Sequence, residues 1–190
     1  MMPENAGFVP WVTAWSAESH RTAQPCTHVG GKVAVFMPEA QGVGVPMFKE
    51  IHLPRRRRAF RERLCEVCGE YASPRDRWLW PMGNWLNDEG EIVDRTEARW
   101  FCAAQGFSHA KCGQNAKMHC PFLRSVVMQP RLAPQDTKIK GIERSDLPAG
   151  NSLSVIVSIH PGLSRAQYRN IFGNIEPIRG THVGGRELDN

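Results

Sequence analysis

The sequence predicts an α+β fold: a small mixed sheet with short helices and a treble-clef-like zinc segment. Short β-branched or aromatic segments alternate with two or three short helical ones along the 190 residues, without a heptad or a parallel-unit rhythm. Cysteine and histidine occur in two closely spaced pairs, which is typical of a structural zinc site. An arginine-rich segment directly precedes the first pair. These three observations predict a zinc-binding segment built into a larger domain that contains a sheet.

The strands are expected to be short. Residues 10–15 and 32–36 are rich in β-branched and aromatic side chains, which favours strands. The glycine-rich residues 42–46 predict a turn, since they lack the spacing and the following lysine of a phosphate-binding loop. Residues 78–93 are compatible with a hairpin whose turn lies at 84–90. Several short strands joined by turns are therefore expected in the first half of the chain.

A helix is predicted from Pro54 to about Leu64, because proline is well tolerated at the start of a helix. Leu53, Phe60 and Leu64 would form its apolar stripe. Two arginines and a glutamate are expected to face solvent on the opposite side: Arg55, Arg58 and Glu62. Three further arginines are expected to flank the stripe: Arg56, Arg57 and Arg63. The prediction is an amphipathic helix with a strongly cationic outer surface.

Net charge is concentrated in this segment. The chain carries a formal charge of +5, and residues 49–63 alone hold seven positive and two negative side chains. Clustered arginine attracts phosphates and acidic surfaces, so nucleic acid or an acidic protein is the expected partner. The expected partner-binding residues are Arg55, Arg56, Arg57, Arg58 and Arg61. The alternative is a solvated helix face whose arginine stems cover apolar surface and whose charges pair with nearby acids such as Glu62 and Glu66.

A Cys–Cys pair and a His–Cys pair together predict one structural zinc ion. Cys65 and Cys68 frame a tight turn that ends at Gly69, the form of a zinc knuckle. His109 and Cys112 are predicted to share one face of the first turn of a helix over 109–120 that Ser108 would cap. A knuckle, a hairpin and a helix that supplies the last two ligands constitute a treble clef. The predicted Zn2+ ligands are Cys65, Cys68, His109 and Cys112.

Three other residues leave alternatives for this site. Cys102, His119 and Cys120 lie near enough in sequence to replace one of the four ligands. Cys120 precedes an apolar Pro-Phe-Leu segment, so packing is its expected role. Cys26 and His28 are expected to be loop residues without a function.

The motifs resemble a family of small uncharacterised proteins from actinobacteria and their phages. The pattern consists of the basic segment 55–59, the Cys65–Gly69 knuckle, the His109-x-x-Cys112 pair and the segment Cys-Pro-Phe-Leu at 120–123. The flanking segments 10–16 and 173–186 also look like family features, although the insert that holds Cys102 departs from the pattern. The resemblance implies zinc binding and a phage or actinobacterial setting, and it implies no particular activity.

The chain is expected to form three segments within one compact domain: N-terminal strands and the basic helix (1–64), the zinc-binding segment (65–124), and a linker with a C-terminal α/β segment (125–190). In the last segment, residues 125–152 are predicted to be a connection, 153–159 a strand, and 164–172 a helix capped by Ser164.

Neither a signal peptide nor an apolar run of bilayer length is present, so a cytoplasmic location and no membrane partner are expected. No small-molecule substrate is indicated. The combined prediction is a non-catalytic, zinc-stabilised phage or actinobacterial accessory protein that binds an anionic partner through its arginine-rich helix. The alternative is a metal-dependent nuclease of the His-Asn-His type, although the Asp-His pair expected of such an enzyme does not occur between residues 65 and 112.

Overall fold

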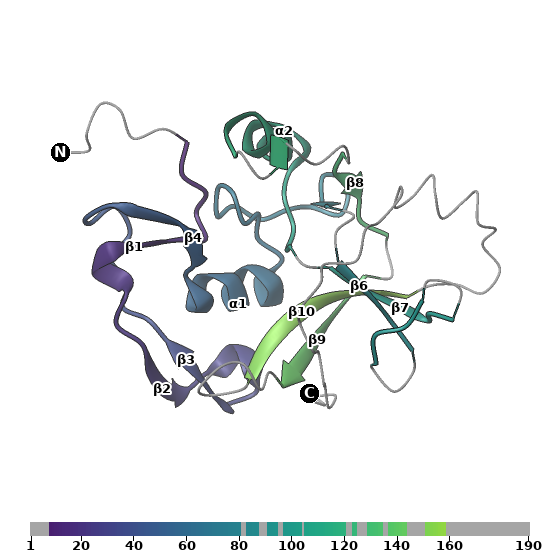
Figure 1. Cartoon of the computed structure of the whole chain (residues 1–190), viewed down its shortest axis with the longest axis horizontal. Coiled ribbons are helices and arrows are strands. Elements are labelled where there is room, and N and C mark those ends of the chain that lie inside the picture. The colour runs from purple at the N-terminus through teal and green to yellow at the C-terminus, as the bar shows by residue number, and fades with distance from the viewer. Residues whose placement is uncertain are drawn as a thin grey trace.

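The computed structural model describes residues 8–80, 83–87, 91–94, 97–103, 105–120, 123–124, 129–134, 137–143 and 151–158. Short strands and two α-helices make up this part of the chain (Figure 1), so the predicted α+β class is confirmed. The predicted helix over 164–172 and any strands after residue 174 lie outside the described residues.

The first half of the chain holds two small antiparallel sheets and the first helix. β1 (Thr13–Trp15) pairs with β4 (Pro46–Ile51). Between them, β2 (Thr22–Pro25) pairs with β3 (Val33–Phe36), and two 3-10 helices, η1 (Ser16–Glu18) and η2 (Thr27–Val29), connect the strands. α1 (Leu53–Glu62) follows β4 directly and lies centrally in Figure 1. The strands predicted over 10–15 and 32–36 are thus present, although β1 covers only the second half of the first range and β3 begins one residue later than predicted.

The second half of the chain contributes a four-stranded sheet in the order β6-β7-β10-β9. Its strands are β6 (Gly83–Leu86), β7 (Trp100–Ala103), β9 (Lys138–Glu143) and β10 (Asn151–Ser158). A separate pair joins β5 (Trp78–Leu79) to β8 (Arg131–Leu132). α2 (Ala110–His119) lies at the top of Figure 1, to the left of β8. Every strand pairing among the described residues is antiparallel, whereas the sequence predicts a mixed sheet.

Two predictions about the second half are wrong. The sequence predicts a hairpin over 78–93 with its turn at 84–90, but Gly83–Leu86 is strand β6 and pairs with β7. The chain does form a hairpin, with a later turn than predicted, because Leu86 bridges Ile92 and the N–H of Val93 donates to the carbonyl of Trp85. All four residues of β6 are buried, so burial overrides the turn preference of Asn84. The sequence predicts a connection over 125–152, yet these residues contain β8, β9 and the start of β10. The predicted strand over 153–159 is confirmed as part of β10.

α1 begins close to the position that proline predicts. His52 is the N-cap, and its Nδ1 accepts a hydrogen bond from the backbone N–H of Arg55 at 3.3 Å. The helix ends at Arg63, which adopts the left-handed conformation with φ 57°. Ala59 and Phe60 are buried on its inner face, as the apolar stripe predicts for Phe60.

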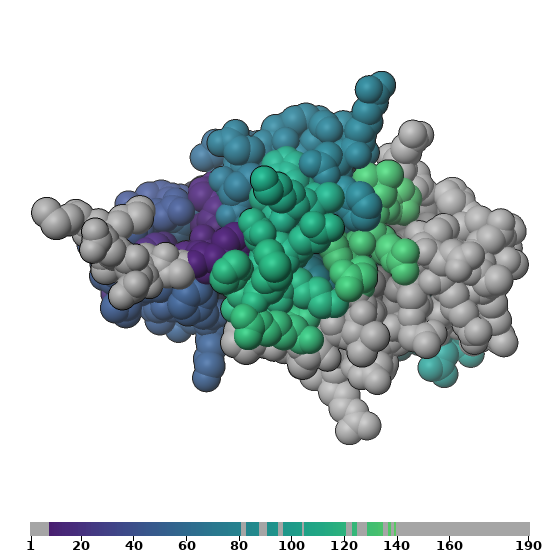
Figure 2. Space-filling view, turned by 90° about the horizontal axis from the view of Figure 1, so that it is seen from above, coloured from purple at the N-terminus to yellow at the C-terminus, as the bar shows by residue number. Residues whose placement is uncertain are grey.

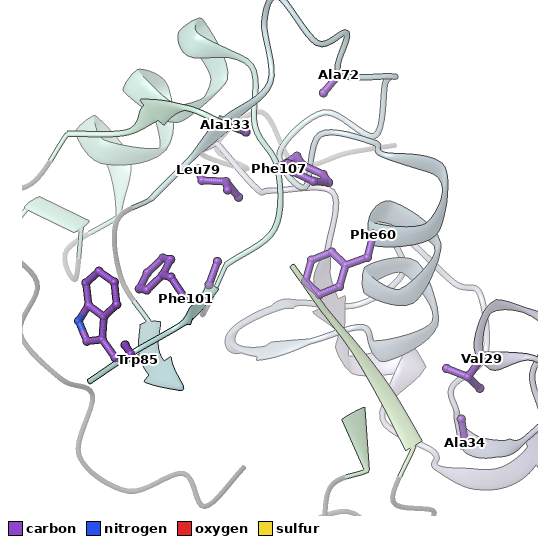
Figure 3. Close-up of a cluster of buried hydrophobic side chains, with 11 residues drawn as sticks. Val29, Ala34, Phe60, Ala72, Leu79, Trp85, Phe101, Phe107 and Ala133 are labelled. Carbon is purple, nitrogen blue, oxygen red and sulfur yellow. The ribbon is translucent and has the colours of Figure 1, made fainter. Parts of the chain in front are cut away.

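The main hydrophobic cluster joins both halves of the chain. Phe60 projects from α1 toward Phe107, while Trp85 and Phe101 lie side by side on β6 and β7 (Figure 3). The ring centroids of Trp85 and Phe101 are 5.1 Å apart, a spacing favourable for aromatic pairs. Phe107 lies just before the helix that carries the second metal pair, so this cluster anchors the segment that holds His109.

Candidate metal centre

The first pair of predicted ligands lies on a tight turn after α1. The backbone N–H of Cys65 donates to the carbonyl of Glu70 at 2.7 Å, and that of Gly69 donates to the carbonyl of Cys65 at 2.8 Å. Gly69 has φ 82°, a conformation that L side chains rarely adopt. A Cβ added there would also lie 3.0 Å from the indole ring of Trp11. Glycine is therefore required both by the turn and by the ring that covers it.

The second pair lies at the start of α2. His109 is the N-cap of this helix and Cys112 lies in its first turn. The segment before it is held by two reciprocal backbone hydrogen bonds between Ser108 and Trp78, at 2.8 and 2.9 Å. The prediction that Ser108 caps the helix is wrong, because His109 occupies the N-cap position and the Ser108 hydroxyl makes no hydrogen bond within the described part of the chain. Asp76 supplies an acceptor instead, since its Oδ1 accepts from the N–H of Ala110 at 2.9 Å.

The fold brings the four predicted ligands together. One donor atom from each of Cys65, Cys68, His109 and Cys112 lies within 4.8 Å of every other. The Nδ1 atom of His109 is 3.4 Å from the Sγ atom of Cys68 and 3.8 Å from that of Cys112. A tetrahedral zinc ion with ordinary Zn–S and Zn–N bond lengths separates sulfur from nitrogen by about 3.6 Å. The donor set and its spacing therefore fit zinc.

The orientation of the imidazole also fits a metal ligand. The Nε2 atom of His109 lies 3.2 Å from the carbonyl oxygen of Tyr71, to which it can only donate. This hydrogen bond selects the tautomer that carries its proton on Nε2, and it leaves the Nδ1 lone pair directed at the two sulfurs. Metal-bound histidines are commonly held in this way by a backbone carbonyl.

Electrostatics at the three thiols favour a bound cation. Burial raises the pKa of the Cys65 thiol, and the backbone N–H groups of Cys68, His109 and Val67 act in the opposite direction by donating to its sulfur. Burial, followed by the neighbouring Cys65 and Cys68 sulfurs, raises the pKa of Cys112 to about 12. Three adjacent thiolates repel one another unless a divalent cation compensates their charge, so metal binding would displace their protons.

A buried glutamate fastens the knuckle to its surroundings. Glu66 lies between the two cysteines, and its Oε2 accepts from the N–H of Gly106 at 2.8 Å. Its Oε1 lies 3.3 Å from Nε of Arg56 on α1. A Cβ at Gly106 would lie 2.2 Å from the Phe60 ring and 2.6 Å from this carboxylate, so only glycine allows the approach. Glu66 thereby connects the knuckle, α1 and the segment leading to His109.

The N-terminal segment pairs with the knuckle from the other side. The backbone N–H groups of Trp11 and Val12 donate to the carbonyls of Val67 and Glu66 at 2.9 and 3.1 Å. In Figure 2 the green residues of α2 adjoin the purple N-terminal residues, in agreement with the stacking of Phe8 on His119 at 5.2 Å. The candidate metal centre is thus connected to the first half of the chain.

The three alternative ligands lie outside this group of four. Cys102 is buried on β7, where it pairs with Asn84 of β6 and Ile156 of β10. His119 is the last residue of α2 and Cys120 is its C-cap, at the opposite end of the helix from His109.

The arginines of α1 are not arranged as predicted. Arg55, expected to face solvent, is 2% exposed, and its guanidinium contacts Oε2 of Glu18 at 2.5 Å and the carbonyl of Thr13 at 3.0 Å. Arg57 is also buried and donates to the carbonyl of Val35. Of the five arginines predicted to bind a partner, Arg58 and Arg61 are exposed and Arg56 is partly buried beside Glu66. Buried acceptors from β1, η1 and β3 draw the long arginine side chains inward.

A second group of possible metal ligands, Glu18, Glu39 and His52, is better explained as structure. Glu18 is fully buried, and its carboxylate accepts from the N–H groups of Trp15 and Ala40 besides Arg55. Nε2 of His52 donates to the carbonyl of Pro38 at 3.0 Å, and burial lowers its pKa. The donor atoms of the two buried residues are thus already hydrogen-bonded.

Sequence reasoning missed Asp76 and Glu18. Glu66 is expected from the sequence only as an acid that pairs with the arginines of α1, which its contact with Arg56 confirms, and its hydrogen bond to the N–H of residue 106 was missed. Asp76 and Glu18 carry no local signal, because each acts on a helix more than thirty residues further along the chain.

No protein-family model matches the chain, and neither the curated proteins nor the solved structures contain a significant match. The resemblance to the actinobacterial and phage family therefore stays a prediction. Among the described residues, no helix has the length and apolar character needed to cross a membrane.

Proposed function

We propose that this chain is a non-catalytic binding module whose local structure is stabilised by one zinc ion. The observation that carries the proposal is the convergence of Cys65, Cys68, His109 and Cys112 within 4.8 Å of one another. Four protein donors complete a tetrahedral shell and leave no position for water or substrate, which is the arrangement of structural zinc. The knuckle and the first turn of α2 would then act as the two ligand-bearing parts of a treble clef.

The proposed partner is anionic, a nucleic acid or an acidic protein surface, and the proposed contact residues are reduced to Arg58 and Arg61. Both are exposed, whereas Arg55 and Arg57 are buried. Nε of Arg61 donates to the carbonyl of His28, so a partner would contact α1 next to η2. Nε of Arg58 lies 3.0 Å from Glu62, so an anionic partner would compete with this exposed ion pair. Two arginines support weak, salt-sensitive binding rather than the recognition of a base sequence.

Replacing Arg58 and Arg61 together with alanine is expected to weaken the binding of duplex DNA or RNA and to reduce its salt dependence. Each lost phosphate contact lowers the slope of log affinity against log salt by about one, so the double variant should lose about two. The fold should survive, because both side chains are exposed. Binding titrations at two or more salt concentrations measure the slope.

The matched control replaces Arg99 and Arg131, two exposed arginines outside α1, with alanine. This variant should retain the slope of the unmodified protein. Salt-independent binding by the unmodified protein would rule out nucleic acid and leave an acidic protein as the proposed partner. Equal binding by the Arg58 and Arg61 variant would show that α1 is not the contact surface.

The nuclease alternative receives no support from the candidate centre. A nuclease of the His-Asn-His type needs a histidine general base and a separate catalytic divalent ion. His109 belongs to the group that fits zinc, and the buried members of the Glu18, Glu39 and His52 group are already hydrogen-bonded. Cleavage of plasmid DNA in the presence of Mg2+, abolished by chelation, would favour this alternative over a binding module.

A further inference from the structure

A cysteine, a histidine and a glutamate form a row on the side of α1 that faces η2. The Sγ atom of Cys26 is 3.9 Å from Nδ1 of His28, and Nε2 of the same ring is 3.5 Å from Oε1 of Glu62. The sequence predicts that Cys26 and His28 are loop residues without a function, and Glu62 comes from a distant helix. The fold therefore brings these three residues together, and no short sequence motif predicts their arrangement.

The backbone around Cys26 is well fixed. Its N–H donates to the carbonyl of Lys32 at 3.0 Å, and its carbonyl accepts from the N–H of Gly31 at 3.0 Å. The tight turn needs glycine, because Gly30 and Gly31 have φ values of 65° and 76°. Val29 is 2% exposed and belongs to the main hydrophobic cluster, which seats η2 in the core.

Two residues of α1 contact His28 of η2. Nε of Arg61 donates to the carbonyl of His28 at 3.1 Å, so η2 and α1 are connected next to the imidazole. Glu62 is shared between His28 and Arg58. Partial burial raises the pKa of Glu62, but the hydrogen bonds from Arg58 and His28 outweigh it and lower the pKa below its usual range. A carboxylate that stays ionised at neutral pH therefore faces the imidazole.

The geometry distinguishes a proton-transfer arrangement from a metal site. The imidazole directs one nitrogen at the cysteine and the opposite nitrogen at the glutamate, so one ion could not bind all three groups. In many enzymes a carboxylate orients a histidine base, and the base removes the proton of a neighbouring thiol, which makes the sulfur a better nucleophile. The side chains are also accessible, since Cys26 is partly buried and His28 and Glu62 are 29% and 43% exposed.

We propose that Cys26 is a reactive thiol, activated by His28 and Glu62, and that its substrates are low-molecular-weight disulfides. Nδ1 of His28 takes the proton of the Cys26 thiol, and Glu62 stabilises the resulting imidazolium. The thiolate attacks one sulfur of the disulfide, a new S–S bond forms at Cys26, and the original S–S bond breaks. The departing thiolate takes the proton from His28. Cys26 is oxidised and one half of the substrate is reduced, so the step is balanced.

The proposal does not depend on the zinc ion, whereas an anion bound by Arg58 and Arg61 would compete with Glu62 and change the surroundings of His28. Among the described residues, the charged groups in contact with this arrangement include Glu62, Arg58 and Arg61, while Lys32 contacts Cys26 through its backbone. β10 also packs against η2, but its sequence contains no titratable residue.

The test measures the rate at which zinc-loaded, full-length protein reacts with a dipyridyl disulfide between about pH 5.5 and pH 9.5, the range in which thiols and imidazoles titrate. Mass spectrometry of peptides assigns the product to Cys26, and Cys26→Ser gives the background from the other cysteines. His28→Asn removes the base and should lower the rate at Cys26 at neutral pH by about tenfold or more, since a positioned base contributes at least this much. The two rates should converge at high pH, where a thiol ionises without the help of a base.

Two further variants sharpen the test. Glu62→Gln should lower the rate at neutral pH by a smaller factor than His28→Asn, because the exposed carboxylate is screened by solvent. His20→Asn makes the same change at an exposed histidine outside the arrangement and should leave the rate unchanged. The absence of product at Cys26 would overturn the proposal and make Cys26 a packing residue. An unchanged rate at Cys26 in His28→Asn would overturn it equally.

Discussion

Replacing Cys65 with serine is expected to abolish zinc binding and to destabilise the protein strongly. Cys65 is fully buried at the centre of the four-residue group, and its turn pairs with both Trp11–Val12 and Phe107. A structural zinc ion contributes roughly 10 kcal/mol or more of binding free energy in small zinc domains, although a 190-residue chain retains other core contacts. A loss of several kcal/mol in the free energy of unfolding is therefore expected, measured by denaturant unfolding with zinc present.

Cys120→Ser is the matched control for this variant. Cys120 lies at the far end of α2, outside the four-residue group. It should retain one zinc ion per chain and lose at most about 1 kcal/mol, as for an ordinary partly buried substitution. Retention of zinc and of stability by Cys65→Ser, together with loss of zinc in Cys120→Ser, would show that the ligands are assigned wrongly.

Replacing Arg55 with methionine is expected to cost about 3–5 kcal/mol of stability, because it leaves the Glu18 carboxylate buried without its counter-charge. Arg55 and Glu18 are 2% and 0% exposed, and their closest atoms are 2.5 Å apart. Glu18 also accepts hydrogen bonds from the N–H groups of Trp15 and Ala40, so it connects η1, α1 and the loop before β4. Urea unfolding measures the loss.

Arg58→Met is the matched control for the buried pair. Arg58 pairs with Glu62 in an exposed arrangement on the same helix, and its loss should change stability by at most about 0.5 kcal/mol. The combined Glu18→Gln and Arg55→Met variant should be less destabilised than the sum of the two single variants, since the pair acts as a unit. Equal stability of Arg55→Met and Arg58→Met would contradict the buried position of Arg55.

Local spacing is enough to predict the residues that converge on the candidate metal centre. Cys65-x-x-Cys68 and His109-x-x-Cys112 each place two donors on one side of a turn, and the structure brings the pairs together. α1 is equally accessible from the sequence, since Pro54 and the spacing of Phe60 define its start and its inner face. These features depend on neighbours in sequence.

The positions of the arginines could not be predicted in the same way. Helical periodicity places Arg55 on the outer side, but its partner Glu18 lies 37 residues earlier and has no local motif. Arg57 is directed inward because it donates to the backbone carbonyl of Val35. A backbone acceptor is present at every residue, so the sequence does not indicate which one an arginine will contact. The same dependence on distant partners explains the wrong turn prediction at β6 and the absence of any sequence signal for the row formed by Cys26, His28 and Glu62.

The most direct test of the zinc-stabilised module is the metal content of the full-length protein, purified without added metal and then treated with a chelator. We expect about one zinc ion per chain, held by three thiolates and one imidazole, and chelation should lower the unfolding temperature, with recovery on adding zinc. Replacement by Co2+ should show absorption typical of tetrahedral thiolate coordination. A fully folded protein without metal, whose unfolding temperature is unaffected by chelator or zinc, would contradict the proposed zinc centre.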